Sequence, residues 1–175
     1  MRWSDELISF CPITYFKIIS MKNILFAYIL LLCTTSFAQK NTSPVAYDSV
    51  LVKKTGADEY GMKKYVMAFL TSGKTEITDA AERQKIQMAH LKNIQKLAAE
   101  GKLIVAGPFL DDQPLRGIFI FNVESVEEAR KLTESDPAIE AGILKMELHP
   151  WYGSAALMET VRIHESLQKK NITDQ

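Results

Sequence analysis

The chain has 175 residues, of which 47% are hydrophobic and 24% are charged. This balance is ordinary for a globular protein, and it excludes a wholly disordered chain and a coiled coil. The 21 Lys and Arg residues equal the 21 Asp and Glu residues, so composition gives no sign of the excess positive charge that nucleic acids or anionic membranes attract. The length predicts one domain with appendages.

The N-terminal segment is typical of a targeting signal. Residues 21–23 are a short basic start, residues 24–32 form an unbroken apolar run, and small side chains occupy the −3 and −1 positions of a cleavage site before Gln39. Because the apolar run is too short to span a bilayer, we predict a signal peptide at residues 21–38 and export to the periplasm or the medium. The alternative is a retained membrane anchor.

Residues 1–20 match no region of a signal peptide, because acidic side chains lie where a basic leader is required. We therefore predict that translation begins at Met21 and that residues 1–20 are a non-native upstream extension. Cleavage before Gln39 removes both cysteines, Cys11 and Cys33. This excludes cysteine nucleophiles, thiolate metal sites and disulfides from the exported chain, and it suits an oxidising compartment.

The first part of the exported chain is predicted to be a tether. Residues 39–62 are polar and lack sustained periodicity, although residues 45–52 have a pattern that also suits a strand. The apolar run at residues 65–70 is closed by a Ser-Gly pair and predicts a buried strand.

Residues 79–100 have the periodicity of an amphipathic helix. Thr78 is the expected N-cap, and Gly101 is the expected stop, since glycine adopts the left-handed conformation that follows many helices. Five residues recur at steps of three or four and share one helical face: Ile86, His90, Ile94, Leu97 and Ala98.

Two more strands are predicted after this helix, at residues 103–106 and 117–123. A connection at residues 109–116 joins them, and the short spacing predicts a hairpin. A capping box at residues 125–128 opens a second helix, which runs to about Glu134.

Asp136-Pro137 ends the second helix or caps a further turn, and a last strand is predicted at residues 143–148. Residues 155–169 have the pattern of an appended amphipathic helix. Its predicted apolar face consists of Leu157, Val161, His164 and Leu167. We therefore place the domain at residues 63–153 and a C-terminal helix and tail at residues 154–175.

The order of predicted elements is β-α-β-β-α-β. This is the ferredoxin-like α+β pattern, in which two helices cover one face of a four-stranded antiparallel sheet. The strand at residues 117–121 is apolar on both faces, and the helices can bury only one of them. We therefore expect a homodimer in which the sheets of two copies pack face to face.

His90 is the first candidate for chemistry. An imidazole on an apolar helix face loses hydration unless it is hydrogen-bonded, and imidazole exchanges protons near neutral pH. The alternative is a core histidine bonded to a backbone carbonyl. Asp136 before Pro137 has the pattern of an N-cap. Asp111 and Asp112 lie in a loop where turn formation is enough to explain them.

Other classes of site find no support in the sequence. The histidines at positions 90, 149 and 164 lack the i, i+4 spacing of a helical zinc site. Ser72 and Ser154 lack the surroundings of a hydrolase nucleophile, and no glycine-rich phosphate loop occurs. We therefore expect neither a metal nor a cofactor.

A series of short motifs follows along the chain: His90-Leu91, Gly101-Lys102-Leu103, Ala106-Gly107-Pro108, Glu127-Glu128-Ala129, Asp136-Pro137, Ala141-Gly142 and Pro150-Trp151. In this order and at this spacing, the sequence resembles the YCII-related (YciI-like) family over roughly residues 64–152. The resemblance implies a ferredoxin-like fold that forms a dimeric α/β barrel. It also implies a histidine–aspartate pair that acts as acid and base in a pocket.

By motif position, the resemblance assigns the histidine to His90 and the aspartate to Asp136, with Asp112 as the reserve acidic partner. It also implies a pocket wall at Gly107 and Pro108, where backbone approaches the ligand. The expected substrate-binding residues are Gly107, Pro108, Asp112 and Trp151.

Together these observations predict an exported enzyme that transfers a proton on a small organic molecule, in a lyase, isomerase or hydrolytic step. His90 is the expected acid or base, and Asp136 orients it. The alternative is a non-catalytic dimeric binding or accessory module, in which the two residues only stabilise the fold. We expect no nucleic-acid partner, and no membrane contact once the signal is removed.

Overall fold

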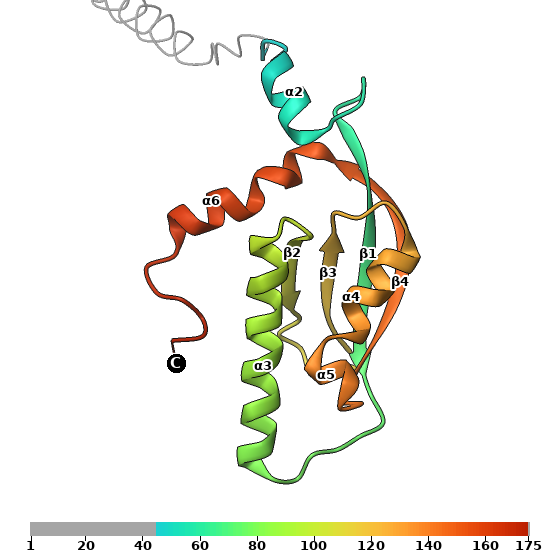
Figure 1. Cartoon of the computed structure of the whole chain (residues 1–175), viewed down its shortest axis with the longest axis vertical. Coiled ribbons are helices and arrows are strands. Elements are labelled where there is room, and N and C mark those ends of the chain that lie inside the picture. Colours follow the sequence, from blue (N-terminus) through green and yellow to red (C-terminus); the bar gives the residue numbers. More distant parts are fainter. Residues whose placement is uncertain (1–44, 175) are drawn as a thin grey trace, which may run out of the picture. The chain divides into compact units, whose positions relative to one another are not determined.

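Four antiparallel strands form one sheet, in the spatial order β2-β3-β1-β4. The structure is a computed structural model that describes residues 45–174. The predicted signal peptide at 21–38 and the predicted extension at 1–20 lie outside the described residues. The strands are β1 (Met62–Ser72), β2 (Leu103–Pro108), β3 (Leu115–Phe121) and β4 (Leu144–Ser154), labelled in Figure 1.

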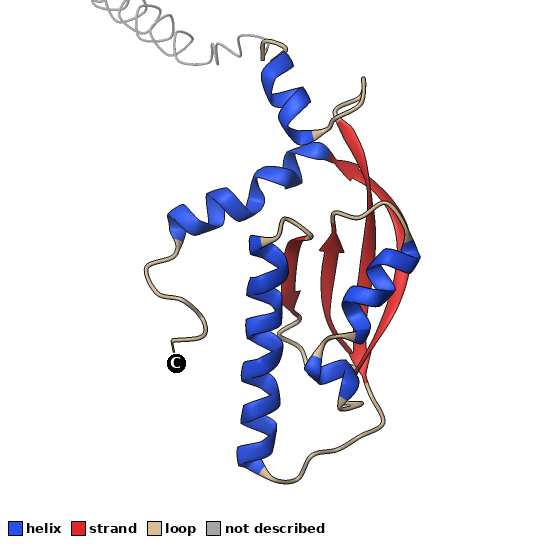
Figure 2. Ribbon diagram, in the orientation of Figure 1, coloured by secondary structure: helices blue, strands red, loops and turns tan. Residues whose placement is uncertain are grey.

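Three helices lie over one face of this sheet (Figures 1 and 2). They are α3 (Ala80–Ala99), α4 (Val126–Glu134) and the short α5 (Pro137–Glu140). The order β1-α3-β2-β3-α4-β4, with α5 inserted before the last strand, is the ferredoxin-like α+β arrangement, so the predicted fold class is confirmed. Between residues 45 and 174, none of the helices has the length and apolar character needed to cross a membrane.

Helix α3 is capped one residue later than predicted. The Asp79 side chain, and not that of Thr78, accepts a hydrogen bond from the Glu82 backbone N–H at 2.7 Å. A carboxylate suits this position because it also meets the positive end of the helix dipole. Gly101 follows the helix with a φ of 69°, as the predicted stop signal requires.

The main core lies between the helices and the sheet face that they cover. Alternate residues of β1 and β3 point to this face, because successive side chains of a strand point to opposite sides. The buried residues of this core are Val66, Ala68, Leu70, Leu97, Leu103, Phe119, Phe121, Val123 and Ala129. Leu97 comes from the predicted apolar face of α3, and this packing holds the same helix face, with His90, against the sheet.

The C-terminal segment differs from the single amphipathic helix predicted at residues 155–169. It consists of a 3₁₀ helix, η2 (Ala155–Glu159), followed by α6 (Thr160–Leu167). The predicted apolar face does not pack as a unit, because α6 contains no buried residue and Leu167 is 74% exposed.

Helix η2 covers part of the other sheet face, the one opposite α3 and α4. Tyr65, Ile104 and Ile120 are buried there and form a second, smaller core. Leu157 and Met158 pack against these three residues. The extension after β4 therefore shields one part of the face that we expected a second copy of the chain to cover.

The segment predicted as a tether contains a short helix, α2 (Ser49–Thr55). The Asp48 side chain accepts hydrogen bonds from two backbone N–H groups of the first turn, and Gly56 ends the helix with a φ of 69°. The strand that we allowed for residues 45–52 is therefore wrong. Its apolar residues belong to a capped helical turn, where the Asp48 cap and the left-handed glycine decide the local structure.

Strand β4 continues well beyond the predicted strand at 143–148. It pairs with β1 along its whole length, including Pro150 opposite Val66. Proline lacks a backbone N–H, but β4 is an edge strand and its outer side needs no donor. Residues 149–153, which we expected to close the core after the last strand, therefore alternate between the two faces of the sheet.

Candidate active site

His90 and Asp136 meet where α3 packs against the start of α5. The His90 Nδ1 atom lies 2.8 Å from Oδ1 and 2.9 Å from Oδ2 of Asp136. Both residues are buried, with 7% of His90 and 1% of Asp136 exposed. Because an ionised carboxylate only accepts hydrogen bonds, Nδ1 is the donor and carries the proton. The alternative of a core histidine bonded to a backbone carbonyl is therefore wrong.

Two further donors hold the Asp136 carboxylate in place. The Ala138 backbone N–H donates to Oδ1 at 3.0 Å, which makes Asp136 the N-cap of α5. The Asn93 Nδ2 atom donates to Oδ2 at 3.0 Å. Asp136 therefore caps a helix and binds the histidine at the same time. Asn93 was missed from the sequence, although its i+3 spacing from His90 places both on one side of α3.

The surroundings of Asp136 favour its charged form. Burial acts to raise the pKa of Asp136, but the hydrogen bond and charge of His90, the Asn93 amide and the Ala138 N–H together hold this pKa below its ordinary value of 3.8. The carboxylate is therefore ionised at neutral pH. It is a fixed negative charge beside Nδ1, and it stabilises the imidazolium that forms when His90 takes up a second proton.

The other ring nitrogen of His90, Nε2, contacts solvent. Within residues 45–174 no side chain or backbone group hydrogen-bonds to Nε2, and no fully buried side-chain nitrogen or oxygen lacks a partner. The imidazole ring also stacks on Phe119 of β3, with ring centroids 6.0 Å apart and planes 15° from parallel. Asp136 and Phe119 therefore fix the ring, and its basic nitrogen can be reached from outside.

The structure gives Gly107 and Pro108 a clear role within the sheet. They end β2 beside Gly117 of β3, where a Cβ on Gly117 would lie 2.5 Å from the Gly107 carbonyl oxygen. A Cβ on Gly107 would meet no atom within 4 Å. The close backbone approach therefore requires glycine at 117, and the predicted ligand contact at Gly107 and Pro108 stays a prediction.

The structure does not bring Asp112 or Trp151 to the pair. The Asp112 side chain is fully exposed and accepts a hydrogen bond from Arg116 Nη1 at 3.0 Å, so the acidic partner of His90 is not this reserve candidate. Trp151 packs against Tyr65, with ring centroids 5.8 Å apart, on the sheet face opposite His90. Within one chain, Trp151 and His90 therefore do not share a site.

Metal-ligating residues do not gather in the part of the chain that the structure describes. Among residues 45–174, no group of three or more His, Cys, Asp and Glu side chains is arranged to hold a metal ion. In the His90–Asp136 pair, Nδ1 and the carboxylate already bind each other.

The described domain matches a known protein family. The profile of the YCII-related domain matches residues 65–152. Among solved structures, the chain is similar to 5-chloro-2-hydroxyhydroquinone dehydrochlorinase from Burkholderia phenoliruptrix AC1100, determined in complex with 2,5-dihydroxybenzoquinone. The two sequences are 26% identical, the match covers 49% of this chain and 92% of that chain, and the TM-score is 0.37. None of the curated proteins matches the chain.

Proposed function

The chain belongs to the YCII-related domain family, and we propose that it catalyses acid/base chemistry on a small organic molecule. His90 transfers the proton. Asp136 orients the imidazole ring and stabilises its protonated form. The observation that carries this proposal is the difference between the two ring nitrogens: Nδ1 is bound to a buried carboxylate, while Nε2 contacts solvent. A histidine held in this way has one nitrogen committed to the fold and one available to a substrate.

The proposed step moves one proton from the substrate to His90 and back to the substrate. Neutral His90 accepts a substrate proton at Nε2 and becomes an imidazolium, whose charge the Asp136 carboxylate stabilises. The same Nε2–H then returns the proton to the leaving group or to another atom of the substrate. General acid/base catalysis of this kind contributes roughly 10²–10⁴ in rate. A lyase, an isomerase and a hydrolytic enzyme all use such a step.

The rival function is a dimeric binding or accessory module without catalysis. One observation favours it: Asp136 caps α5 and binds both His90 and Asn93, so the pair also stabilises the junction of α3 and α5. A useful variant must therefore preserve these contacts and remove only the outward nitrogen.

The variant His90→Asn meets this requirement, because the Asn Nδ2 atom takes the place of Nδ1 and nothing replaces Nε2. We expect His90→Asn to melt within a few degrees of the wild-type protein and to lose turnover or ligand binding in a screen of small metabolites. Asp136→Leu is the matched disruptive variant, which removes the contacts themselves. The binding-module function is favoured instead if His90→Asn keeps every ligand response of the wild-type protein.

We also propose that two copies of the chain associate through the sheet face opposite the helices. Phe69 and Ile118 are only partly buried on that face, and neither belongs to the small core that η2 covers. Phe69→Lys should give a monomer in sedimentation or light-scattering measurements. Leu110→Lys, at a loop residue that is 99% exposed, should leave the dimer intact. A monomeric wild-type protein would contradict this proposal.

Export remains a proposal as well, and it rests on residues 21–38 of the sequence. Mass spectrometry of the protein from its native host tests it. We expect an N-terminus at Gln39, and an intact start at Met21 contradicts a cleaved signal.

A further inference from the structure

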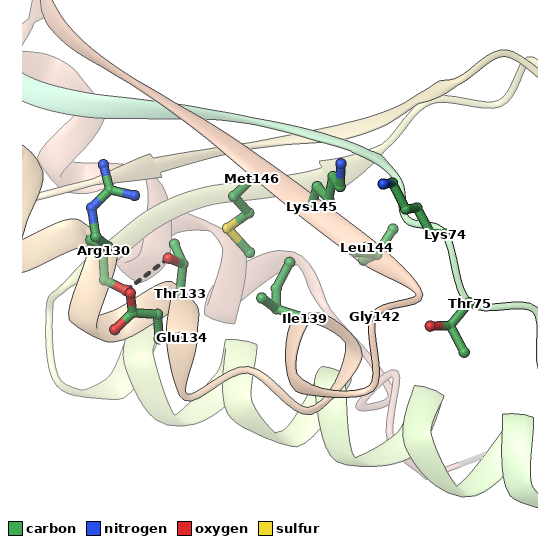
Figure 3. Close-up of a pocket in the computed structure, with 10 residues that line it drawn as sticks. All are labelled: Lys74, Thr75, Arg130, Thr133, Glu134, Ile139, Gly142, Leu144, Lys145 and Met146. Atoms are coloured by element: carbon green, nitrogen blue, oxygen red, sulfur yellow. Dashed lines mark hydrogen bonds between the residues drawn. The ribbon is translucent and has the colours of Figure 1, made fainter.

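A second candidate site lies in a pocket of about 470 Å³ between α4, the α5–β4 turn and the loop after β1 (Figure 3). Its lining residues are Lys74, Thr75, Arg130, Thr133, Glu134, Ile139, Gly142, Leu144, Lys145 and Met146. Neither His90 nor Asp136 is among them. The pocket is therefore separate from the proposed acid/base pair, although its lining includes residues that precede and residues that follow Asp136 in the sequence.

The lining carries more positive than negative charge. It includes Lys74, Arg130 and Lys145 and one acidic residue, Glu134. None of these three cations forms an ion pair with a side chain in residues 45–174. Lys145 lies between Leu144 and Met146 on β4, so its side chain points away from the sheet face on which these two residues pack. Lys74, in the loop after β1, supplies the ammonium group at this end of the pocket. An anion bound beside a positive charge that has no ion-pair partner lowers the electrostatic energy.

The two cationic ends are separated by an apolar stretch. Figure 3 shows the Arg130 guanidinium at one end and Lys74 at the other. The apolar side chains of the lining are Ile139, Leu144 and Met146. A ligand that spans the pocket therefore meets positive charge, then apolar surface, then positive charge again.

The end of the pocket near Lys74 is built on fixed backbone. A Cβ on Gly73 would lie 1.9 Å from the Gly142 carbonyl oxygen, and Gly142 has a φ of 71°. Hydrogen bonds cross this contact from the Gly73 N–H to the Ile143 oxygen at 2.6 Å and from the Thr75 N–H to the Gly142 oxygen at 3.1 Å. The two chain segments are thus held together, and Lys74 projects from a defined wall.

We propose that this pocket binds an organic dianion, with two carboxylates joined by an apolar spacer. The planar Arg130 guanidinium donates two parallel hydrogen bonds to one carboxylate, a geometry that suits arginine. Lys74 binds the other carboxylate, and the spacer covers the apolar stretch. A volume of about 470 Å³ lies in the usual range for small-ligand pockets. This inference goes beyond the proposed function, since it assigns a second site.

Isothermal titration calorimetry with linear dicarboxylates from succinate to suberate tests the proposal, with hexanoate as the monocarboxylate that matches adipate in length. We expect a member of the dicarboxylate series to bind at least tenfold more tightly than hexanoate, and its affinity to fall as salt is added. Arg130→Gln and Lys74→Gln should each weaken this binding about tenfold, since each removes a charged hydrogen bond.

Lys131→Gln is the matched control, because Lys131 is the exposed neighbour of Arg130 on α4 and does not line the pocket. It should leave dicarboxylate affinity unchanged. His90→Asn should leave it unchanged too, which separates this site from the proposed active site. The proposal is overturned if no dicarboxylate binds, if hexanoate binds equally well, or if either control variant weakens binding as much as Arg130→Gln.

Discussion

His90 and Asp136 are 46 positions apart in the sequence, and Nδ1 of the first lies 2.8 Å from Oδ1 of the second. The contact depends on the packing of α3 against α5, and Asp136 reaches it while capping α5. A single carboxylate thus sets the start of one helix and the orientation of a ring on another. The consequences for chemistry and for stability can be tested separately.

Replacing the carboxylate tests its effect on the ring. In Asp136→Asn the charged acceptor becomes a neutral amide, so the imidazolium loses its counter-charge and Nδ1 loses a charge-assisted hydrogen bond. We expect the downfield Nδ1–H resonance of wild-type protein to disappear from the proton NMR spectrum, and acid/base turnover to fall by roughly 10²–10⁴. A retained resonance with full activity would show that the carboxylate does not orient the ring.

The pH dependence of folding stability should show the lowered pKa of the Asp136 carboxylate. The pKa of Asp136 lies below its ordinary value of 3.8 in the folded protein, so the unfolded chain binds this proton more readily. The stabilisation is therefore complete above pH 3.8 and is lost as the pH falls through the lower folded pKa. Denaturant titrations below pH 4 should show a steeper loss of stability for wild type than for Asp136→Asn. Parallel curves for the two proteins would contradict the pairing.

Asn93 is predicted to be a positioning residue. Asn93→Ala removes the hydrogen bond to Asp136 Oδ2, which should cost about 1 kcal/mol in the free energy of unfolding. It should also broaden the pH profile of turnover or shift it, because the carboxylate is then less firmly held. Asn93→Ser tests for partial rescue by a shorter donor. An unchanged pH profile in Asn93→Ala would leave the residue with a purely structural role.

Two glycines should differ in how much folding stability the protein loses when each is replaced by alanine. Gly73→Ala places a Cβ 1.9 Å from the Gly142 carbonyl oxygen, whereas Gly107→Ala meets no atom within 4 Å. We expect thermal or chemical unfolding to show a loss of about 1–3 kcal/mol for Gly73→Ala and a change within about 0.5 kcal/mol for Gly107→Ala. Weaker ligand binding by a stable Gly107→Ala would support the predicted ligand contact there.

The sequence was sufficient for the order of the four strands and of helices α3 and α4, because the signals were local. Gly101 ends α3, Ser125 caps α4, and the apolar runs fall within the strands. The family resemblance, which rests on short motifs, identified His90 and Asp136 as candidates. Whether they touch was beyond the sequence, because that depends on how far α3 and α5 are separated after packing.

The errors arose where tertiary context decides the local structure. Pro150 normally argues against a strand, but an edge position tolerates it, so β4 runs on through Trp151. The added strand residues alternate between faces, and this places Trp151 opposite the side where His90 lies. Asn93 escaped notice because a single amide on a helix carries no motif until its acceptor is known.

The central claim is that the outward Nε2 atom of His90 moves protons on a small molecule. The most direct measurement follows a panel of small carbonyl, hydroxy-acid and lactone metabolites in D₂O by proton NMR, with wild-type and His90→Asn protein side by side. The account predicts solvent exchange or turnover of at least one compound with the wild-type protein, and none with a His90→Asn protein that melts within a few degrees of it. Equal turnover by both proteins, or no reaction from a wild-type protein whose His90→Asn variant melts far lower, would contradict it.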